Sequence, residues 1–196
     1  KPPPINLNLQ KKDPKHIDSH TTYTEQYPYT LNLQHTPLPL TYKKFQAAWD
    51  PKSFIYTDGT QKRGNPKLGA SIVNPQTGIT IHIEIKSQEE RHTINRAELS
   101  AITLTLDLHK EAPTLQILTD SAFSINTLRN YALNPLRYTH HTHKDLLAHT
   151  NNIIKDRDAK GYTTHIGKVK SHTGVIYNDA ADAGAGGVVD GDILPD

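Results

Sequence analysis

Apolar and polar residues alternate most clearly over residues 79–85, where isoleucine occupies every second position and Thr, His and Glu lie between. A period of two is typical of a β-strand with one buried face. Residues 53–57 and 68–73 are also rich in β-branched, aromatic or aliphatic residues and end at turn-forming residues, which favours two further strands. We expect these three segments to be adjacent antiparallel strands.

The period changes to about 3.6 from residue 95, where Ala and Leu residues from Ala97 to Leu108 share one stripe. This pattern predicts a core-facing helix that ends before Pro113. The remaining chain predicts a strand at 115–119, helices at 121–130 and 144–156, a strand at 162–170 and an Ala-rich helix at 178–185.

The predicted order of elements is β-β-β-α-β-α-α-β-α. Parallel neighbouring strands require crossover connections, which are usually helices. We therefore expect an α/β fold with a mixed five-stranded sheet, in which three antiparallel strands are followed by parallel additions, flanked by helices. Ligands of such sheets gather at the strand ends.

The chain divides into three regions by composition. Residues 1–50 contain more than half of the thirteen prolines and no sustained periodicity, which predicts an extended arm or linker, although its leucines could dock on a folded neighbour. Residues 51–187 form the predicted folded domain, and residues 188–196 an acidic Gly/Asp tail. The chain has no methionine and no secretory signal pattern, so we expect an intracellular protein, in nucleus or cytoplasm, that is processed or cut from a longer polypeptide.

Composition excludes several classes of protein. The 196 residues include no cysteine, which excludes disulfide scaffolds, thiol nucleophiles and Cys-ligated zinc. No apolar run approaches the roughly 18 residues of a transmembrane helix, so we expect no membrane partner. Residues 52–177 carry 16 Lys and Arg against 11 Asp and Glu. This balance modestly favours a polyanionic partner, although it is also typical of an ordinary soluble surface.

Four carboxylates lie at strand ends or in the helices of the predicted fold. Asp58 ends the first strand, Asp120 ends the fourth strand, Glu98 lies in the first turn of the first helix, and Asp182 lies in the last helix. Each has an ordinary alternative: a turn pair in Asp58-Gly59, a capping box from Asn95 to Glu98, an N-cap at Asp120 and solvation at Asp182.

Together, carboxylates gathered at neighbouring strand ends would repel one another unless they bound cations. Oxygen-only ligands suit a hard ion, Mg²⁺ or Mn²⁺. Two such ions can hold the attacking and leaving oxygens of a phosphodiester.

Five segments carry a family resemblance: YTDG at 56–59, NRAEL at 95–99, LTDS at 118–121, VKSHTG at 169–174 and NDAAD at 178–182. In this order they resemble the signature blocks of type 1 ribonuclease H, and the resemblance covers about residues 53 to 186. It implies an enzyme that cleaves the RNA strand of RNA/DNA hybrids with two Mg²⁺ ions, Mn²⁺ being an alternative.

The resemblance also implies residue roles. Asp58 would bridge both metals, with Glu98 and Asp120 on one side and Asp182 on the other. His172 would lie on a loop that assists metal exchange or product release.

Arg91 and Thr93 would bind a DNA phosphate, and Asn95 would contact the minor groove of the hybrid. Two of these residues also have an explanation that does not involve nucleic acid, since Arg91 could be solvated and Thr93 could cap the helix.

Two features depart from the family pattern. Ile94 stands where many members have Asn. The region 131–143, where many cellular members carry a Trp-containing basic protrusion, has no Trp. There Arg137 would contact nucleic acid, and Tyr131 or Tyr138 could serve as an aromatic platform, although a loop tyrosine is more often packing. The histidines of residues 140–143 favour a basic loop over a transition-metal site.

The proline-rich leader and missing initiator favour the ribonuclease H domain of a retroelement polyprotein, with the reverse transcriptase of that polyprotein as a partner. Trp49 would anchor the leader or face a neighbouring domain. Alternatives are an integrase or transposase of the same fold, a non-catalytic nucleic-acid-binding or scaffold domain, and a cation-binding protein without catalysis. The integrase class usually lacks carboxylates and loops equivalent to Glu98 and His172, so the motifs favour ribonuclease H.

Overall fold

The computed structural model describes residues 21–24, 51–61, 67–85, 93–169 and 176–191. In chain order, its elements are β1 (Thr21–Thr24), η3 (Pro51–Ser53), β2 (Ile55–Gln61), β3 (Leu68–Asn74), β4 (Ile79–Ile85), α3 (Ile94–Leu108), β5 (Thr114–Thr119), α4 (Ala122–Leu133), η4 (Pro135–Tyr138), α5 (Lys144–Ala159), β6 (Thr163–Lys168) and α6 (Ile176–Asp190).

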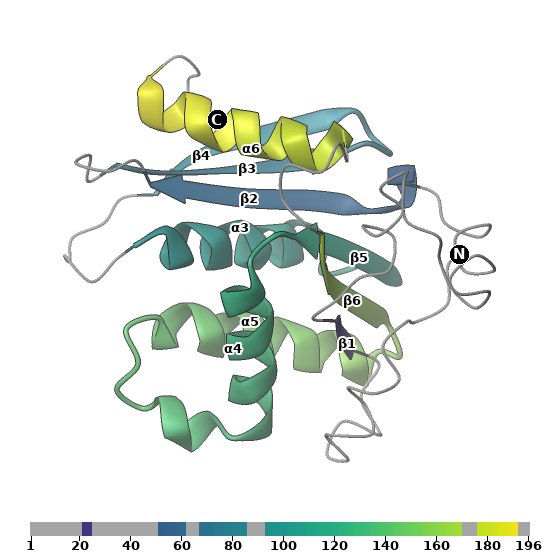
Figure 1. The fold of residues 1–196 in the computed structure, drawn as a ribbon. Helices are drawn as coiled ribbons and strands as arrows, with labels where there is room; N and C mark the ends of the chain where they lie inside the picture. Colours follow the sequence, from purple (N-terminus) through teal and green to yellow (C-terminus); the bar gives the residue numbers. More distant parts are fainter. Residues whose placement is uncertain (1–20, 25–50, 62–66, 86–92, 170–175, 192–196) are drawn as a thin grey trace, which may run out of the picture.

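One mixed sheet organises the fold, with the strand order β1-β6-β5-β2-β3-β4. Strands β2, β3 and β4 form the predicted antiparallel meander, and β5 and β6 add in parallel on the other side of β2. Helix α6 covers one face of the sheet, whereas α3, α4 and α5 lie on the other (Figure 1). The predicted α/β class and its five strands are confirmed.

A sixth strand, β1, was not predicted. It lies in the proline-rich region and pairs in parallel with β6, with Thr21 opposite Thr164. The four residues TTYT are good strand formers, but a segment this short shows no readable alternation. The edge of β6 supplies hydrogen-bonding groups that such a segment can pair with.

The ordinary alternative for Asp58-Gly59, a turn pair, is contradicted. Strand β2 continues through both residues to Gln61, with Asp58 opposite Ser71 and Gly59 opposite Ala70. A Cβ atom at Gly59 would lie 2.5 Å from the backbone nitrogen of Glu98. Glycine is therefore needed because the first turn of α3 packs directly on the strand backbone, not because the chain turns.

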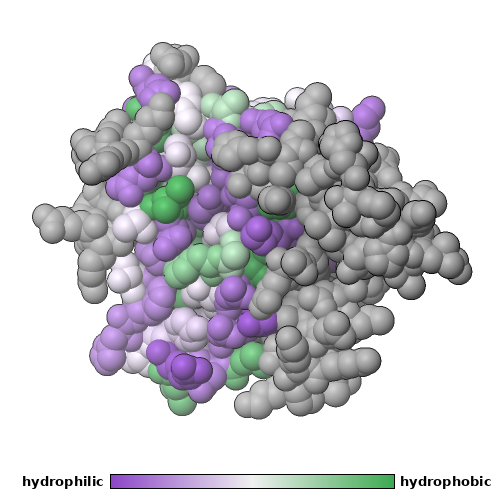
Figure 2. Space-filling model, in the orientation of Figure 1, coloured by the Kyte–Doolittle hydropathy of each residue, from purple (hydrophilic) through white to green (hydrophobic). Residues whose placement is uncertain are grey.

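Two hydrophobic clusters fill the faces of the sheet. The larger lies on the side of α3, α4 and α5 and includes Leu99, Ile102, Ile117 and Ile154. The smaller lies under α6 and consists of Phe54, Tyr56, Val73, Leu118, Val169 and Ala181, with Tyr177 packed against it. Isolated exposed apolar residues remain, and the described part of the face in Figure 2 is largely hydrophilic over α4 and α5.

Helix α6 extends beyond its predicted end, to Asp190. Its Gly and Asp composition predicted a tail, but Val188 and Val189 are buried, and both lie against Gly69 of β3. Burial of these valines outweighs the weak helix propensity of the glycines before them. The division of the chain at residues 50 and 187 stays a prediction.

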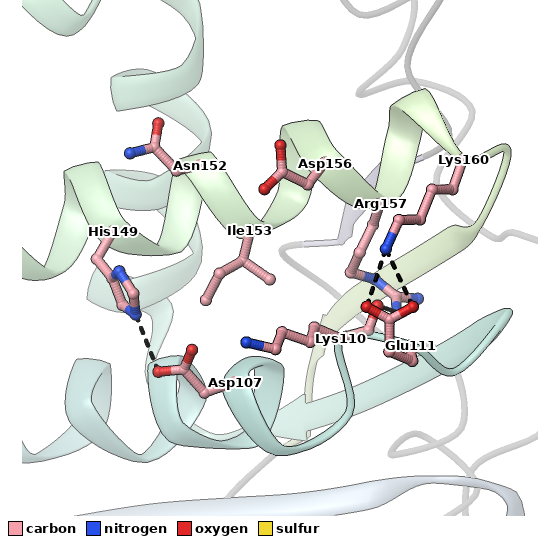
Figure 3. A pocket seen from close by; sticks show the side chains of 9 residues that line it. All are labelled: Asp107, Lys110, Glu111, His149, Asn152, Ile153, Asp156, Arg157 and Lys160. Carbon is pink, nitrogen blue, oxygen red and sulfur yellow. Dashed lines mark hydrogen bonds and ion pairs between the residues drawn. The ribbon is translucent and has the colours of Figure 1, made fainter.

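A buried arginine joins three elements on the side of the sheet away from α6. The Arg157 side chain of α5 is 1% exposed. Its Nε donates to Thr164 Oγ1, and its terminal nitrogens donate to the carbonyls of His109, Lys110, Ala112 and Thr163. Figure 3 shows this guanidinium at one end of a pocket between α3 and α5, beside the Lys160–Glu111 ion pair.

No helix within the described ranges is long and apolar enough to cross a membrane.

We expect Arg157→Leu to lower the free energy of unfolding by about 3 kcal/mol or more, because several partly buried carbonyls and the buried Thr164 hydroxyl would lose their donor. Urea denaturation measures this loss. Lys160→Ala is the matched control, since its ion pair with Glu111 is exposed and such pairs contribute about 0 to 1 kcal/mol. Equal losses in the two variants would contradict the anchoring role of Arg157.

Candidate active site

Three carboxylates converge where two parallel strands separate. Strand β5 ends at Thr119, opposite Thr57 of β2, so Asp58 and Asp120 both lie just beyond the paired residues. Glu98 reaches the same place from the first turns of α3. One carboxylate oxygen from each of Asp58, Glu98 and Asp120 lies within 4.8 Å of the other two.

Neither Glu98 nor Asp120 is used as a helix cap. The hydroxyl of Thr93 caps α3 by accepting the N–H of Asn95, and the hydroxyl of Ser121 caps α4 by accepting the N–H of Ser124. The capping alternatives for Glu98 and Asp120 were therefore wrong. Both carboxylates therefore belong to the cluster with Asp58 rather than to a helix cap.

Asp182 of α6 completes the group from the opposite face of the sheet. Its carboxyl group contacts that of Asp58 by a side-chain hydrogen bond, so it is not simply a solvated residue. One open pocket of about 350 Å³ holds all four carboxylates. Its lining residues are Asp58, Gly59, Thr60, Ile94, Asn95, Glu98, Asp120, Ser121 and Asp182.

The cluster is electrostatically unfavourable as it stands. Burial raises the pKa of Asp58 to about 11, with further contributions from the charges of Glu98 and Asp120. Burial and the nearby charge of Asp120 raise the pKa of Glu98 well above its ordinary value. Without a counterion, these groups favour their protonated forms.

The donor atoms fit a hard divalent cation. Asp58 Oδ2 and Glu98 Oε2 are buried and accept no hydrogen bond from the protein. Unsatisfied buried oxygens of this kind are costly, and a cation supplies the missing partner. Oxygen-only ligands are those that Mg²⁺ and Mn²⁺ prefer. Among the described residues, this is the one group of His, Asp or Glu side chains arranged to hold a metal ion.

Comparison with known proteins agrees with this geometry. The family model described as RNase H matches residues 50–189. The chain belongs to the RNase H family. The match spans most of the chain, includes every element from β2 to β6 and extends through α6 to residue 189. The prediction of a ribonuclease H is therefore confirmed.

Solved structures share the fold at low sequence identity. The RNase H domain resembles LC11-RNase H1, solved in complex with RNA/DNA hybrid, at 21% identity and a TM-score of 0.51, covering 72% of this chain and 99% of that one. It also resembles the foamy viral protease-reverse transcriptase, solved in complex with dsDNA, at 18% identity and a TM-score of 0.55, covering 72% and 97%. No curated protein matches the chain by sequence.

The structure places some of the predicted nucleic-acid contacts at this pocket. Asn95 lines it beside Ile94, whose side chain is 41% exposed. Thr93 is half-buried, and its hydroxyl caps α3. Arg91 and His172 lie outside the described residues.

The aromatic platform at Tyr131 is contradicted. Tyr131 is only 8% exposed within the larger hydrophobic cluster, and its ring packs edge-on against Tyr138 at 5.7 Å between centroids. A buried ring cannot stack on a base. Sequence reasoning placed it in a loop, whereas α4 continues to Leu133 and turns Tyr131 inward. Arg137, in η4, is exposed.

The histidines before α5 are packed with aromatic rings. The centroids of the His141 and His143 rings lie 5.5 Å apart, so the two side chains are close neighbours. However, the Nδ1 atom of His141 accepts the backbone N–H of His143 at 3.0 Å. This bond occupies one of the ring nitrogens that a transition metal would need, so a local packing role is favoured.

We expect Asp58→Asn to stabilise the metal-free protein by about 1 to 3 kcal/mol near neutral pH, because the amide is neutral without taking up a proton, whereas the buried carboxyl of the parent must be protonated on folding. Since folding raises this pKa from 3.8 to about 11, the folded state binds the proton more tightly. The parent should therefore lose stability relative to Asp58→Asn as pH rises above about 4. Thermal unfolding between pH 4 and pH 9 in EDTA measures this difference.

A difference in unfolding temperature between the parent and Asp58→Asn that does not increase with pH would contradict the raised pKa of Asp58. Addition of Mg²⁺ should stabilise the parent more than Asp58→Asn, since only the parent retains the full set of ligands.

Proposed function

We propose that this RNase H domain hydrolyses the RNA strand of RNA/DNA hybrids by a two-metal-ion mechanism. The observation that carries the proposal is the convergence of Asp58, Glu98 and Asp120, with oxygens within 4.8 Å, beside Asp182 in one open pocket. Membership of the RNase H family supports the substrate class.

The four carboxylates would divide between two ions. Asp58 makes side-chain contacts with both Glu98 and Asp182, so it would contribute to holding both ions. Glu98 and Asp120 would complete one site, and Asp182 the other. When bound, Mg²⁺ or Mn²⁺ would activate a water and stabilise the charge that develops on the phosphate.

The protein's own contribution is to hold these ligands rigidly and to leave one side open. Glu98 is fixed because its helix backbone lies against Gly59, and Asp120 because Ser121 caps the next helix. Asn95 lies at the rim of the same pocket, where its amide can bond to a sugar hydroxyl or a base edge. Hydroxyl contacts of this kind distinguish RNA from DNA.

The proposal extends to the setting of the domain, a retroelement polyprotein with its reverse transcriptase as partner. Proline-rich residues 1–50 precede the family match, and such composition is typical of semi-rigid spacers between domains. If this setting is correct, adding the reverse transcriptase should increase hybrid affinity; unchanged affinity would count against the partnership.

We expect Asp120→Asn to lower the cleavage rate by orders of magnitude, because it removes a negative ligand from the site while preserving shape. The measurement is cleavage of an end-labelled RNA/DNA hybrid with Mg²⁺, Mn²⁺ or EDTA, with RNA and DNA duplexes as controls. Asp156→Asn is a matched control, since Asp156 is exposed on α5. A folded Asp120→Asn protein with parental turnover would rule out the mechanism.

Metal binding and hybrid binding without cleavage by the parent would instead favour the non-catalytic alternative. Cleavage of DNA duplexes would favour the integrase class.

We also expect hybrid affinity to fall steeply between low and physiological salt, because residues 52–177 are net basic and phosphate contacts release counterions. Arg137→Ala should reduce the slope of log affinity against log salt by about 1 if this exposed residue contacts a phosphate. Binding titrations at several salt concentrations measure the slope. An unchanged slope would remove Arg137 from the interface.

A further inference from the structure

A row of polar residues crosses three strands of the sheet and ends at a proposed metal ligand. The strand registers place Asp58 of β2 opposite Ser71 of β3, and Ser71 opposite His82 of β4. Directly opposed residues of antiparallel strands point to the same face, with Cβ atoms about 4.5 to 5.5 Å apart. The three side chains are therefore successive neighbours on one face.

Helix α6 covers this row. A Cβ atom at Gly184 of α6 would lie 2.5 Å from Ser71 Oγ and 3.0 Å from His82 Nδ1. Both side chains therefore lie against the backbone of α6. Figure 1 shows this helix lying over β2, β3 and β4. Because Gly59 faces α3, alternation along β2 turns Asp58 to the α6 face as well.

The chemistry of the row favours a hydrogen-bonded chain. Ser71 is completely buried, and its hydroxyl has no hydrogen-bond partner in the protein. The neighbouring Asp58 Oδ2 is also buried and without a donor. An ionised carboxylate only accepts, whereas a serine hydroxyl both donates and accepts. A hydrogen bond from the Ser71 hydroxyl to the Asp58 carboxylate would therefore give both buried atoms a partner.

We propose that Ser71 and His82 are positioning residues for Asp58. In the metal-loaded protein, Ser71 Oγ–H donates to the Asp58 carboxylate and fixes its orientation. In the same metal-loaded state, His82 on the half-buried edge strand β4 donates through Nδ1–H to Ser71 Oγ and holds it in place. The inference rests on the proposed function, because it assumes that Asp58 binds the metal. Partners behind metal ligands commonly contribute about 10- to 100-fold in metal affinity or activity.

The test is Mn²⁺ binding to the full chain without substrate, measured by isothermal titration calorimetry, with thermal unfolding recorded alongside. Ser71→Ala should weaken Mn²⁺ binding about 10-fold, with little change in thermal stability. His82→Phe, which keeps a ring but removes its nitrogens, should weaken binding by a smaller factor. The double variant should bind no more weakly than Ser71→Ala, because His82 acts through Ser71.

Thr105→Val is the control for loss of a buried hydroxyl. Its hydroxyl is buried in α3 and donates to the carbonyl of Ala101, so it should bind Mn²⁺ as the parent does. Parental Mn²⁺ affinity in Ser71→Ala would overturn the proposal, and so would equal weakening in Ser71→Ala and Thr105→Val.

Asp120→Asn separates this proposal from the function on which it rests. If Asp120→Asn loses Mn²⁺ binding while Ser71→Ala keeps it, the positioning role alone fails. If Asp120→Asn binds Mn²⁺ like the parent, the metal centre itself is misassigned, and both proposals fail.

Discussion

Repulsion between buried carboxylates is the constraint on which this structure depends. Asp58 and Glu98 are almost fully buried, and their pKa values are raised because burial and neighbouring acids oppose ionisation. A fold gains no stability from such a cluster. The cluster instead forms a site where a divalent cation would neutralise the carboxylates. The metal-free protein is therefore less stable at the site that its function requires.

The surrounding fold holds this cluster together through close approaches of backbone. Gly59 lets α3 lie against β2, which places Glu98 beside Asp58. Gly184 lets α6 lie against Ser71 and His82, which places Asp182 on the other side of the same carboxylate. Larger residues at either glycine would move a ligand-bearing helix away from the sheet. The backbone contacts on the two faces of β2 therefore set the geometry of one site.

Sequence patterns predicted the sheet and the site because both depend on periodic burial and local order. The alternation of β4 and the apolar stripe of α3 predicted their burial. Asp58 and Asp120 followed from predicted strand ends, whereas Glu98 and Asp182 were placed in predicted helices and assigned through the family motifs. The turn-pair alternative at Asp58-Gly59 fails because the close contact with α3, not a bend, requires that glycine. Burial of Tyr131 depends on where α4 ends, and Val188 and Val189 continue α6 through packing on β3. The Asp58–Ser71–His82 row depends on strand register, which no single strand's pattern reveals.

The most direct test of the account is a crystal structure of the full chain soaked with Mn²⁺, in which anomalous scattering locates the ions. The account predicts two peaks in the pocket, both within bonding distance of Asp58, one also near Glu98 and Asp120 and the other near Asp182. The absence of any peak at these carboxylates, with Mn²⁺ present at saturating concentration, would contradict it.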